Sequence, residues 1–248
     1  KTYIPRALES TVIKASQSFP VVLVTGPRQV GKTTMLRKVC SEIMDNLSYV
    51  TFDNVMLREL ARKDPELFLQ RYTPPLMIDE FQYVPELLPY IKMAVDSRGE
   101  NGQYFLTGSQ LFSMMQNVSE SLAGRVGLLQ LYGFSQAELS NQKSVPFVPK
   151  TNFAEYSNLP QRGVKELFEV IFRGSMPRMA TNPELQSEDF YSSYVKTYLE
   201  RDIRDIINIR NERAFLRFLS CLAIRTGQEL VASELAKDSG LNISQLPV

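Results

Sequence analysis

Residues 21–33 read VVLVTGPRQVGKT, and this stretch carries the two signals that set the expected fold. The first signal is the Val-rich run 21–24, which is typical of a strand buried on both faces in a parallel sheet. The second is the segment from Gly26 to Thr33, which fits the pattern G-x-x-x-x-G-K-S/T at every specified position. We therefore expect a strand, a phosphate-binding loop and a helix in succession, rather than an ordinary glycine-rich turn.

The loop pattern predicts a nucleotide-binding site with defined roles for its residues. Glycines let successive backbone N–H groups turn inward, and the following helix N-terminus attracts anions through its dipole. Lys32 would place a positive charge against the outer phosphates, and the Thr33 hydroxyl would hold Mg²⁺. The predicted nucleotide-binding residues are Gly26, Pro27, Arg28, Gln29, Val30, Gly31, Lys32, Thr33 and Thr34.

A second chemical element lies at residues 76–80, where the sequence LMIDE ends an apolar run on two carboxylates. Asp79 is predicted to hold Mg²⁺, directly or through water, and Glu80 is predicted to be the catalytic residue that polarises the attacking water. Adjacent carboxylates at a strand end are also common as solvated turn residues. Their position after a phosphate-binding loop is what favours the catalytic interpretation.

Two further segments supply candidate catalytic residues, each with an alternative. The fourth apolar run ends at Thr107 and Ser109, and in P-loop proteins with a strand added between the loop strand and the carboxylate strand it is inserted centrally, beside the γ-phosphate. Either hydroxyl would then sense that phosphate or position the water, or would merely satisfy the turn. Arg125 would stabilise charge in phosphoryl transfer, in its own subunit or a neighbour, or would anchor a helix end.

The rest of the chain divides into an alternating part and a helical part. Apolar runs that read as strands alternate with helix-period segments at 33–44, 54–72 and 85–96, after a first helix within 3–18. This alternation predicts an α/β fold, a parallel sheet covered by helices on both faces. The predicted strands are 21–24, 47–52, 76–78, 104–106 and 127–132. We assign residues 1–140 to a P-loop ATPase core, 141–160 to a proline-bearing linker and 161–248 to a second domain.

The second domain is predicted to be helical and winged-helix-like. Helical patterns span 164–172, 187–209 and 214–225, and residues 229–244 resemble the start of a helix-turn-helix with its turn at Gly240. Such a unit would contact DNA or a protein partner. Its second helix begins with Asn242 and Ser244 and shows no Arg or Lys, which favours a packing role over DNA binding.

Composition excludes several other classes of protein. The chain has 248 residues and no His, so it cannot supply a Ser-His-Asp site or a His-bearing zinc site by itself. Cys40 and Cys221 stand far apart and predict reduced, buried thiols. The net charge of +1 gives no global attraction to nucleic acid, and no apolar run approaches a membrane span. We expect a cytoplasmic protein without membrane contact, and the start at Lys1 suggests a piece of a longer chain.

The nucleotide is predicted to be ATP. A guanine site usually places a carboxylate against the base in an N/T-K-x-D segment after the fifth strand, and no such segment is present. Adenine is read mostly by backbone and apolar contacts, which leave little trace in a sequence. The segment from Tyr3 to Arg6 is one place where the base could lie.

Taken together, these motifs resemble the AAA-like ATPases that carry a C-terminal domain of unknown function, DUF4143. The resemblance covers residues 3 to about 139 and rests on YIPR at 3–6, the loop at 24–34, IDEFQ at 78–82, LTGS at 106–109 and LAGR at 122–125. It implies ATP binding, a core of the ASCE type, a helical lid with a winged helix, and a further domain that is missing from this chain.

Two functions from different classes follow from these observations. The first is a Mg²⁺-dependent ATPase that couples hydrolysis to conformational change, as a single chain or in an oligomer. The second is a nucleotide-dependent switch with negligible turnover that gates a DNA or protein contact. A small-molecule kinase is disfavoured, because such enzymes do not usually need a Glu directly after the metal-binding Asp.

Overall fold

The computed structural model describes residues 3–109, 118, 120–142, 162–198 and 212–241. The chain forms two compact units, Lys1–Leu185 and Gln186–Val248.

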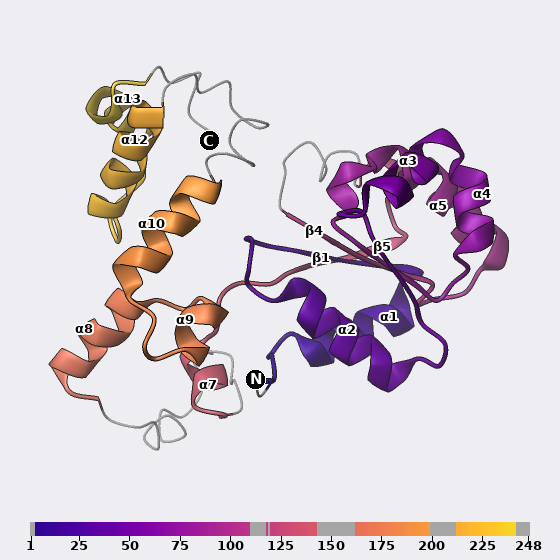
Figure 1. The fold of residues 1–248 in the computed structure, drawn as a ribbon, viewed down its shortest axis with the longest axis horizontal. Helices are drawn as coiled ribbons and strands as arrows, with labels where there is room; N and C mark the ends of the chain where they lie inside the picture. The colour runs from indigo at the N-terminus through magenta and orange to yellow at the C-terminus, as the bar shows by residue number, and fades with distance from the viewer. Residues whose placement is uncertain (1–2, 110–117, 119, 143–161, 199–211, 242–248) are drawn as a thin grey trace. The chain divides into compact units, whose positions relative to one another are not determined.

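The first unit is built on a five-stranded parallel sheet (Figure 1). Its strands are β1 (Val21–Thr25), β2 (Ser48–Thr51), β3 (Leu76–Asp79), β4 (Tyr104–Gly108) and β5 (Val126–Gln130). They lie in the order β2-β3-β4-β1-β5, so β4 is inserted between the loop strand β1 and the carboxylate strand β3. This arrangement confirms the predicted α/β fold of a P-loop NTPase.

The central strands explain why the sequence signal was clear. Every residue of β1, β3 and β4 is buried, whereas β2 and β5 lie at the edges and carry partly exposed residues. A strand covered on both faces needs apolar side chains on both faces, so its sequence is a continuous apolar run.

Helices cover both faces of the sheet (Figure 1). On one face lie α1 (Glu9–Ser18) and α2 (Lys32–Ile43), and on the other lie α3 (Val55–Lys63), α4 (Pro65–Arg71) and α5 (Leu88–Arg98). Two apolar cores result, one around Met35 and Val39 of α2 and one around Phe68 and Ile91. Two short 3-10 helices, η1 (Phe81–Tyr83) and η2 (Pro85–Leu87), connect β3 to α5.

Two helices differ from the predicted spans for local reasons. The helix expected within 3–18 begins at Glu9, because Glu9 accepts hydrogen bonds from the Tyr3 hydroxyl and the Arg6 N–H, which fold the preceding residues into a turn. The helix expected over 54–72 is interrupted at Asp64. This residue caps α4 by accepting from the Leu67 N–H, and the Pro65 that follows occupies the first helical position.

Three further helices of the first unit follow β5: α7 (Gln136–Leu139), α8 (Val164–Arg173) and α9 (Pro177–Thr181). The turn between α8 and α9 is attached to the segment after β5, since the Phe134 N–H donates to the Ser175 carbonyl at 2.7 Å. The first unit therefore includes α8 and α9, which differs from the predicted domain boundary. Of the predicted linker 141–160, residues 143–160 lie outside the described residues.

The second unit consists, in its described part, of α10 (Ser187–Tyr198), α12 (Glu212–Ile224) and α13 (Ala232–Ser239). Helices α12 and α13 pack through Phe215, Phe218 and Leu235. The pair is also joined at its surface by Arg225, which bonds both Glu234 and Asp238. Gly240 ends α13 in the left-handed conformation, and the residues after 241, where the second helix of the predicted motif would lie, are outside the described part.

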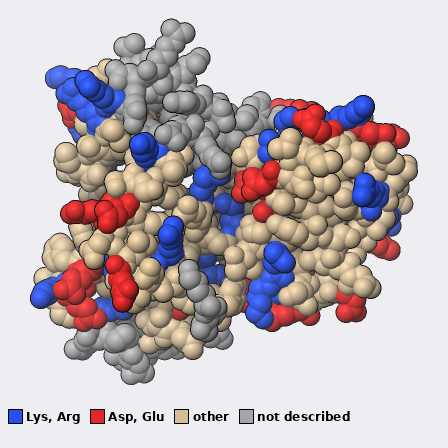
Figure 2. All heavy atoms as spheres, viewed as in Figure 1, with Lys and Arg blue, Asp and Glu red and all other residues tan. Residues whose placement is uncertain are grey.

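Two surface properties bear on partners. None of the helices within the described ranges has the length and apolar character that crossing a bilayer requires. On the face drawn in Figure 2, basic and acidic side chains are interspersed over the described part of each unit.

Candidate active site

The carboxyl edge of the sheet gathers most of the predicted site. Because all five strands are parallel, β1, β3 and β4 end at the same edge. The phosphate-binding loop follows β1, Asp79 closes β3, and Ser109 directly follows β4. Hydrogen bonds join these segments into one polar cluster.

Glycine is needed in the loop for two separate reasons. Gly26 has φ +143°, and a Cβ there would lie 2.0 Å from the Leu131 carbonyl oxygen, so the chain after β5 approaches too closely for a side chain. Gly31 has φ +93° at the N-cap of α2, in the left-handed region that favours glycine. Gly26 is therefore required by the close approach of the Leu131 carbonyl, and Gly31 by the backbone conformation at the start of α2.

Lys32 is the first residue of α2, and its side chain curls back over the loop. It is buried, and its Nζ donates to the carbonyl oxygens of Gly26 and Pro27, at 2.9 Å each. The ammonium group therefore lies along the loop that would hold a phosphate. Since carbonyl oxygens are neutral acceptors, an anionic phosphate is the stronger partner for this charge.

Asp79 is the centre of a group of hydroxyl donors. Its side chain is 7% exposed, and its Oδ1 accepts a hydrogen bond from the Thr33 Oγ1 at 2.6 Å. The Thr107 hydroxyl donates to the same oxygen, and the Tyr49 hydroxyl donates to Oδ2 at 3.3 Å. The structure thus brings together the two residues predicted to hold Mg²⁺, Thr33 and Asp79.

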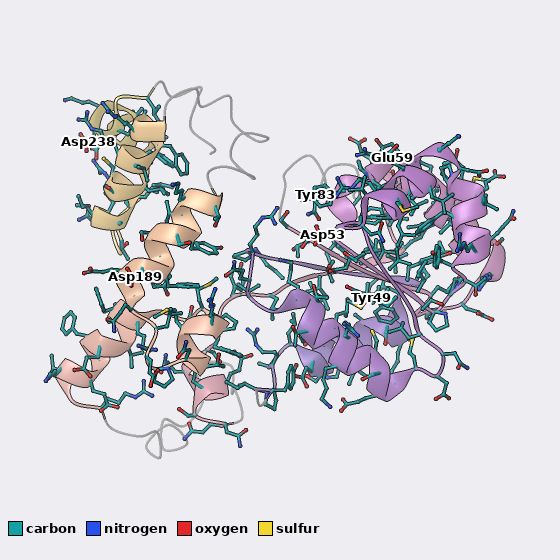
Figure 3. The ribbon with its side chains drawn as sticks, in the orientation of Figure 1. Tyr49, Asp53, Glu59, Tyr83, Asp189 and Asp238 are labelled. Atoms are coloured by element: carbon teal, nitrogen blue, oxygen red, sulfur yellow. The ribbon has the colours of Figure 1, made fainter. Side chains whose placement is uncertain are left out.

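Tyr49 is a component of this site that sequence analysis missed. It lies on β2, next to β3, where Figure 3 labels it beside α2. Burial raises the pKa of its hydroxyl, and the neighbouring charge of Asp79 raises it further, so the phenol remains a donor. The guanidinium of Arg37 lies 4.8 Å from its ring centroid. The feature of the sequence that could have identified Tyr49 is a polar aromatic residue in the strand next to the carboxylate strand.

The position of Glu80 is fixed by its backbone conformation and by a hydrogen bond to its side chain from a neighbouring residue. Its φ of +55° places it in the left-handed region, and its N–H donates to the Thr107 Oγ1 at 3.3 Å. Its carboxylate accepts a hydrogen bond from the Gln82 Nε2. Such a backbone conformation is uncommon for a non-glycine residue and clusters at functional sites. Gln82 is a second residue that sequence analysis missed.

The two hydroxyls after β4 have different surroundings. Thr107 is fully buried and is used within the cluster, by Asp79 and by Glu80. Ser109 is 6% exposed, and its buried Oγ has no hydrogen-bond partner among the residues that the structure describes. A buried hydroxyl without a partner costs free energy unless something binds to it. This contrast favours Ser109 over Thr107 as the hydroxyl available to a bound group.

Arg125 lies away from the loop, which contradicts a role in its own site. It immediately precedes β5, and its carbonyl accepts from the N–H of Val21, the first residue of β1. That is the amino edge of the sheet, whereas the loop follows the carboxyl end of β1. Its guanidinium bonds both carboxylate oxygens of Asp96 and the Ala123 carbonyl. Action on phosphates bound by the same chain is therefore wrong, and action on a neighbouring subunit stays a prediction.

The residues present fit a nucleotide with its magnesium ion. Among the described residues, no cluster of three or more His, Cys, Asp or Glu side chains could hold a metal ion alone. Mg²⁺ is usually bound through one or two protein oxygens, phosphates and waters, and Thr33 with Asp79 offers that donor set. Lys32 and the Ser109 hydroxyl, which has no partner within the described part of the chain, add donors for anionic oxygens.

Comparison with known families divides the chain earlier than the two compact units do, between residues 140 and 164. Residues 18–140 match the family described as an AAA domain, and residues 164–246 match a domain of unknown function, DUF8612. The second match concerns the helical part and carries no activity in its description.

Individual relatives and a solved structure are also similar to the chain. Over 94% of its length the chain is 30% identical to uncharacterized proteins of Mycobacterium tuberculosis and Mycobacterium bovis, and it spans 46% of their length. A Walker-type ATPase of Pyrococcus abyssi shares the fold with a TM-score of 0.54 and 16% identity, over 96% of this chain and 90% of that one. Residues 18–140 therefore match the family described as an AAA domain and have the fold of a P-loop NTPase.

Proposed function

We propose that this chain binds ATP with Mg²⁺ and hydrolyses it to ADP and phosphate. The observation that carries the proposal is the 2.6 Å contact between Thr33 and Asp79, formed directly beside the loop that Lys32 spans. These two oxygens come from different elements, the start of α2 and the end of β3. Their meeting is the arrangement that a magnesium-bound triphosphate requires.

The proposed roles follow from the contacts. The amides of 26–34 and Lys32 hold the phosphates, and Thr33 with Asp79 holds the metal ion, which would neutralise charge on the phosphates. Glu80 orients and deprotonates the attacking water, and Ser109 donates to the γ-phosphate or the water. Asp79 already accepts three hydroxyl hydrogen bonds.

A nucleotide switch with negligible turnover is the second candidate, and one contact favours it. The Glu80 carboxylate accepts a hydrogen bond from Gln82 at one oxygen, and turning that oxygen toward a water would exchange the amide for the water. If that exchange is slow, ATP would be bound and retained. Nucleotide state would then control a partner rather than drive repeated cycles.

Counting phosphate released per chain separates the two candidates. We expect the full-length protein to release many phosphates per chain in Mg²⁺ and none in EDTA. The measurement is repeated with and without DNA, because a bound partner can release the Glu80 carboxylate. Release of at most one phosphate per chain under all these conditions contradicts the ATPase proposal and supports the switch.

The wider role remains part of the same proposal. We infer that ATP binding changes the conformation of the helical part, which would act as a winged-helix-like module toward DNA or protein. An oligomer would give Arg125 access to a neighbouring site.

Replacing Tyr49 with Phe tests the metal-binding arrangement. Loss of the hydroxyl removes the donor to Asp79 Oδ2, so we expect the Mg²⁺ concentration for half-maximal hydrolysis to rise about threefold to tenfold. The rate at saturating Mg²⁺ should change less than about twofold, because the Tyr49 hydroxyl donates to the metal-binding Asp79 and not to the proposed catalytic Glu80. The measurement is a Mg²⁺ titration, with Tyr90→Phe on α5 as the control. An unchanged half-saturation point would contradict this role.

A further inference from the structure

Arg6, just before α1, is a charged residue buried against the phosphate-binding loop. It is 6% exposed, although a buried charge is costly unless it is fully hydrogen-bonded. Its Nη1 donates to the Val30 carbonyl of the loop at 2.9 Å. Sequence analysis gave residues 3–6 as one place where the base could lie, and in the structure the Arg6 side chain bonds the phosphate-binding loop itself.

The other donors of Arg6 bind the segment that follows β5. Nη2 donates to the carbonyl oxygens of Tyr132 and Gly133, at 2.8 and 3.1 Å, and Nε pairs with Glu138 at 3.0 Å. The guanidinium also lies 4.5 Å from the centroid of the Phe134 ring. Although burial opposes ionisation of Glu138, hydrogen bonds from Ser135, Ala7 and Arg6 lower its pKa, so the pair is charged.

The bond to Val30 constrains the orientation of a loop amide. The carbonyl of Val30 and the N–H of Gly31 belong to one trans peptide, so they point in opposite directions. Holding the carbonyl toward Arg6 therefore turns the Gly31 N–H away from Arg6. Gly31 is the N-cap of α2, where free N–H groups face a bound anion.

The segment held by Arg6 also carries the turn before α9. Gly133 packs directly on Ser175, since a Cβ at Gly133 would lie 2.3 Å from the Ser175 Oγ. The Phe134 N–H donates to the Ser175 carbonyl at 2.7 Å, and Met176 packs against the core under α2. A continuous path of contacts thus runs from the loop through Arg6 to the α8–α9 turn.

We propose that Arg6 is a positioning residue that orients the Val30–Gly31 peptide for phosphate binding and thereby links nucleotide binding to the turn at Ser175. This inference rests on the proposed ATP binding. Because linkage is reciprocal, bound nucleotide must stabilise the turn by the amount that the attached turn strengthens nucleotide binding. If Arg6 only supported the fold, its replacement would lower the free energy of unfolding, but bound nucleotide would not stabilise the turn at Ser175.

Arg6→Lys is the main test, made in the full-length protein. Lysine keeps the charge, but its single ammonium group cannot reach all the acceptors that surround the planar guanidinium of Arg6. We expect the dissociation constant for Mg²⁺–AMPPNP, measured by calorimetry, to rise at least about tenfold. In the wild type the analogue should slow amide exchange in residues 132–139, and in Arg6→Lys this protection should disappear. Circular dichroism and a urea titration establish that the variant is folded.

Gly133→Ala alters the same chain of contacts at its other end, where Gly133 packs on Ser175. It keeps the inference testable if Arg6→Lys does not fold. The added methyl group must displace Ser175, so analogue binding should weaken about threefold or more in the wild-type background and no further in Arg6→Lys. Gly163→Ala is the control, because a Cβ at Gly163 meets no atom of the described residues within 4 Å.

Two outcomes overturn the inference in distinguishable ways. If the wild type binds the analogue and both Arg6→Lys and Gly133→Ala bind it equally well, the role of Arg6 is wrong while ATP binding stands. If the wild type binds no analogue and behaves like Lys32→Ala, the proposed function fails and this inference fails with it.

Discussion

Replacing Glu80 with Gln is expected to lower the steady-state rate of ATP hydrolysis at least about a hundredfold while ATP is still bound. Glutamine has nearly the same shape as glutamate but cannot accept a proton. The backbone of Glu80, with its bond to Thr107, is unaffected by the change, so the fold of the site should persist. The loss should therefore fall on the rate constant and not on the dissociation constant for ATP.

The experiment compares phosphate release with ATP binding measured separately by calorimetry. Glu86→Gln is a matched control, because Glu86 is an exposed residue of η2 that carries the same carboxylate a few residues along the chain. We expect Glu86→Gln to hydrolyse ATP like the wild type. Hydrolysis by Glu80→Gln at the wild-type rate would show that another group activates the water.

Replacing Lys32 with Ala is expected to weaken ATP binding by about tenfold to a hundredfold or more. The estimate follows from the loss of charge-assisted hydrogen bonds to phosphate, each worth roughly 1.5–3 kcal/mol. Lys32 bonds the Gly26 and Pro27 carbonyl groups, so its removal also loosens the loop backbone. Hydrolysis should fall with binding, because the outer phosphates are no longer held.

Lys38→Ala serves as the control for this loss of charge. Lys38 lies on the same helix, is exposed and pairs with Glu42, so its removal changes the net charge equally without touching the loop. Calorimetric titration with ATP in Mg²⁺ should separate the two variants clearly. Equal affinity in Lys32→Ala and Lys38→Ala would contradict the placement of phosphates in the loop.

Much of the fold was predictable because its signals are local. The strand before the loop, the glycines of the loop and the carboxylates after β3 each occupy a few consecutive residues. The central position of β4 was expected from the strand arrangement of P-loop proteins, once the loop motif had indicated that class. The interruption at Asp64 was a local signal too, since Pro65 favours the start of a new helix, but the apolar spacing across 54–72 concealed it.

The position of Arg125 could have been foreseen from topology alone. A residue that precedes a strand of a parallel sheet lies at the amino edge, whereas a loop that follows a strand lies at the carboxyl edge. The positive charge of Arg125 suggested a contact with phosphate. The direction of the strands excludes that contact with a nucleotide bound by the same chain. Its actual partner, Asp96, lies 29 residues earlier at the end of α5.

The composition of the site depends on contacts between residues far apart along the chain. A phosphate-binding loop and a carboxylate strand are recognisable by themselves, because backbone geometry demands glycine and metal chemistry demands oxygen at fixed positions. The bonds of Tyr49 to Asp79 and of Arg6 to Val30 have no such local requirement. They exist because strand order sets β2 beside β3 and because the segment after β5 folds back over the loop. Side chains of ordinary appearance in the sequence thereby become part of the site through packing.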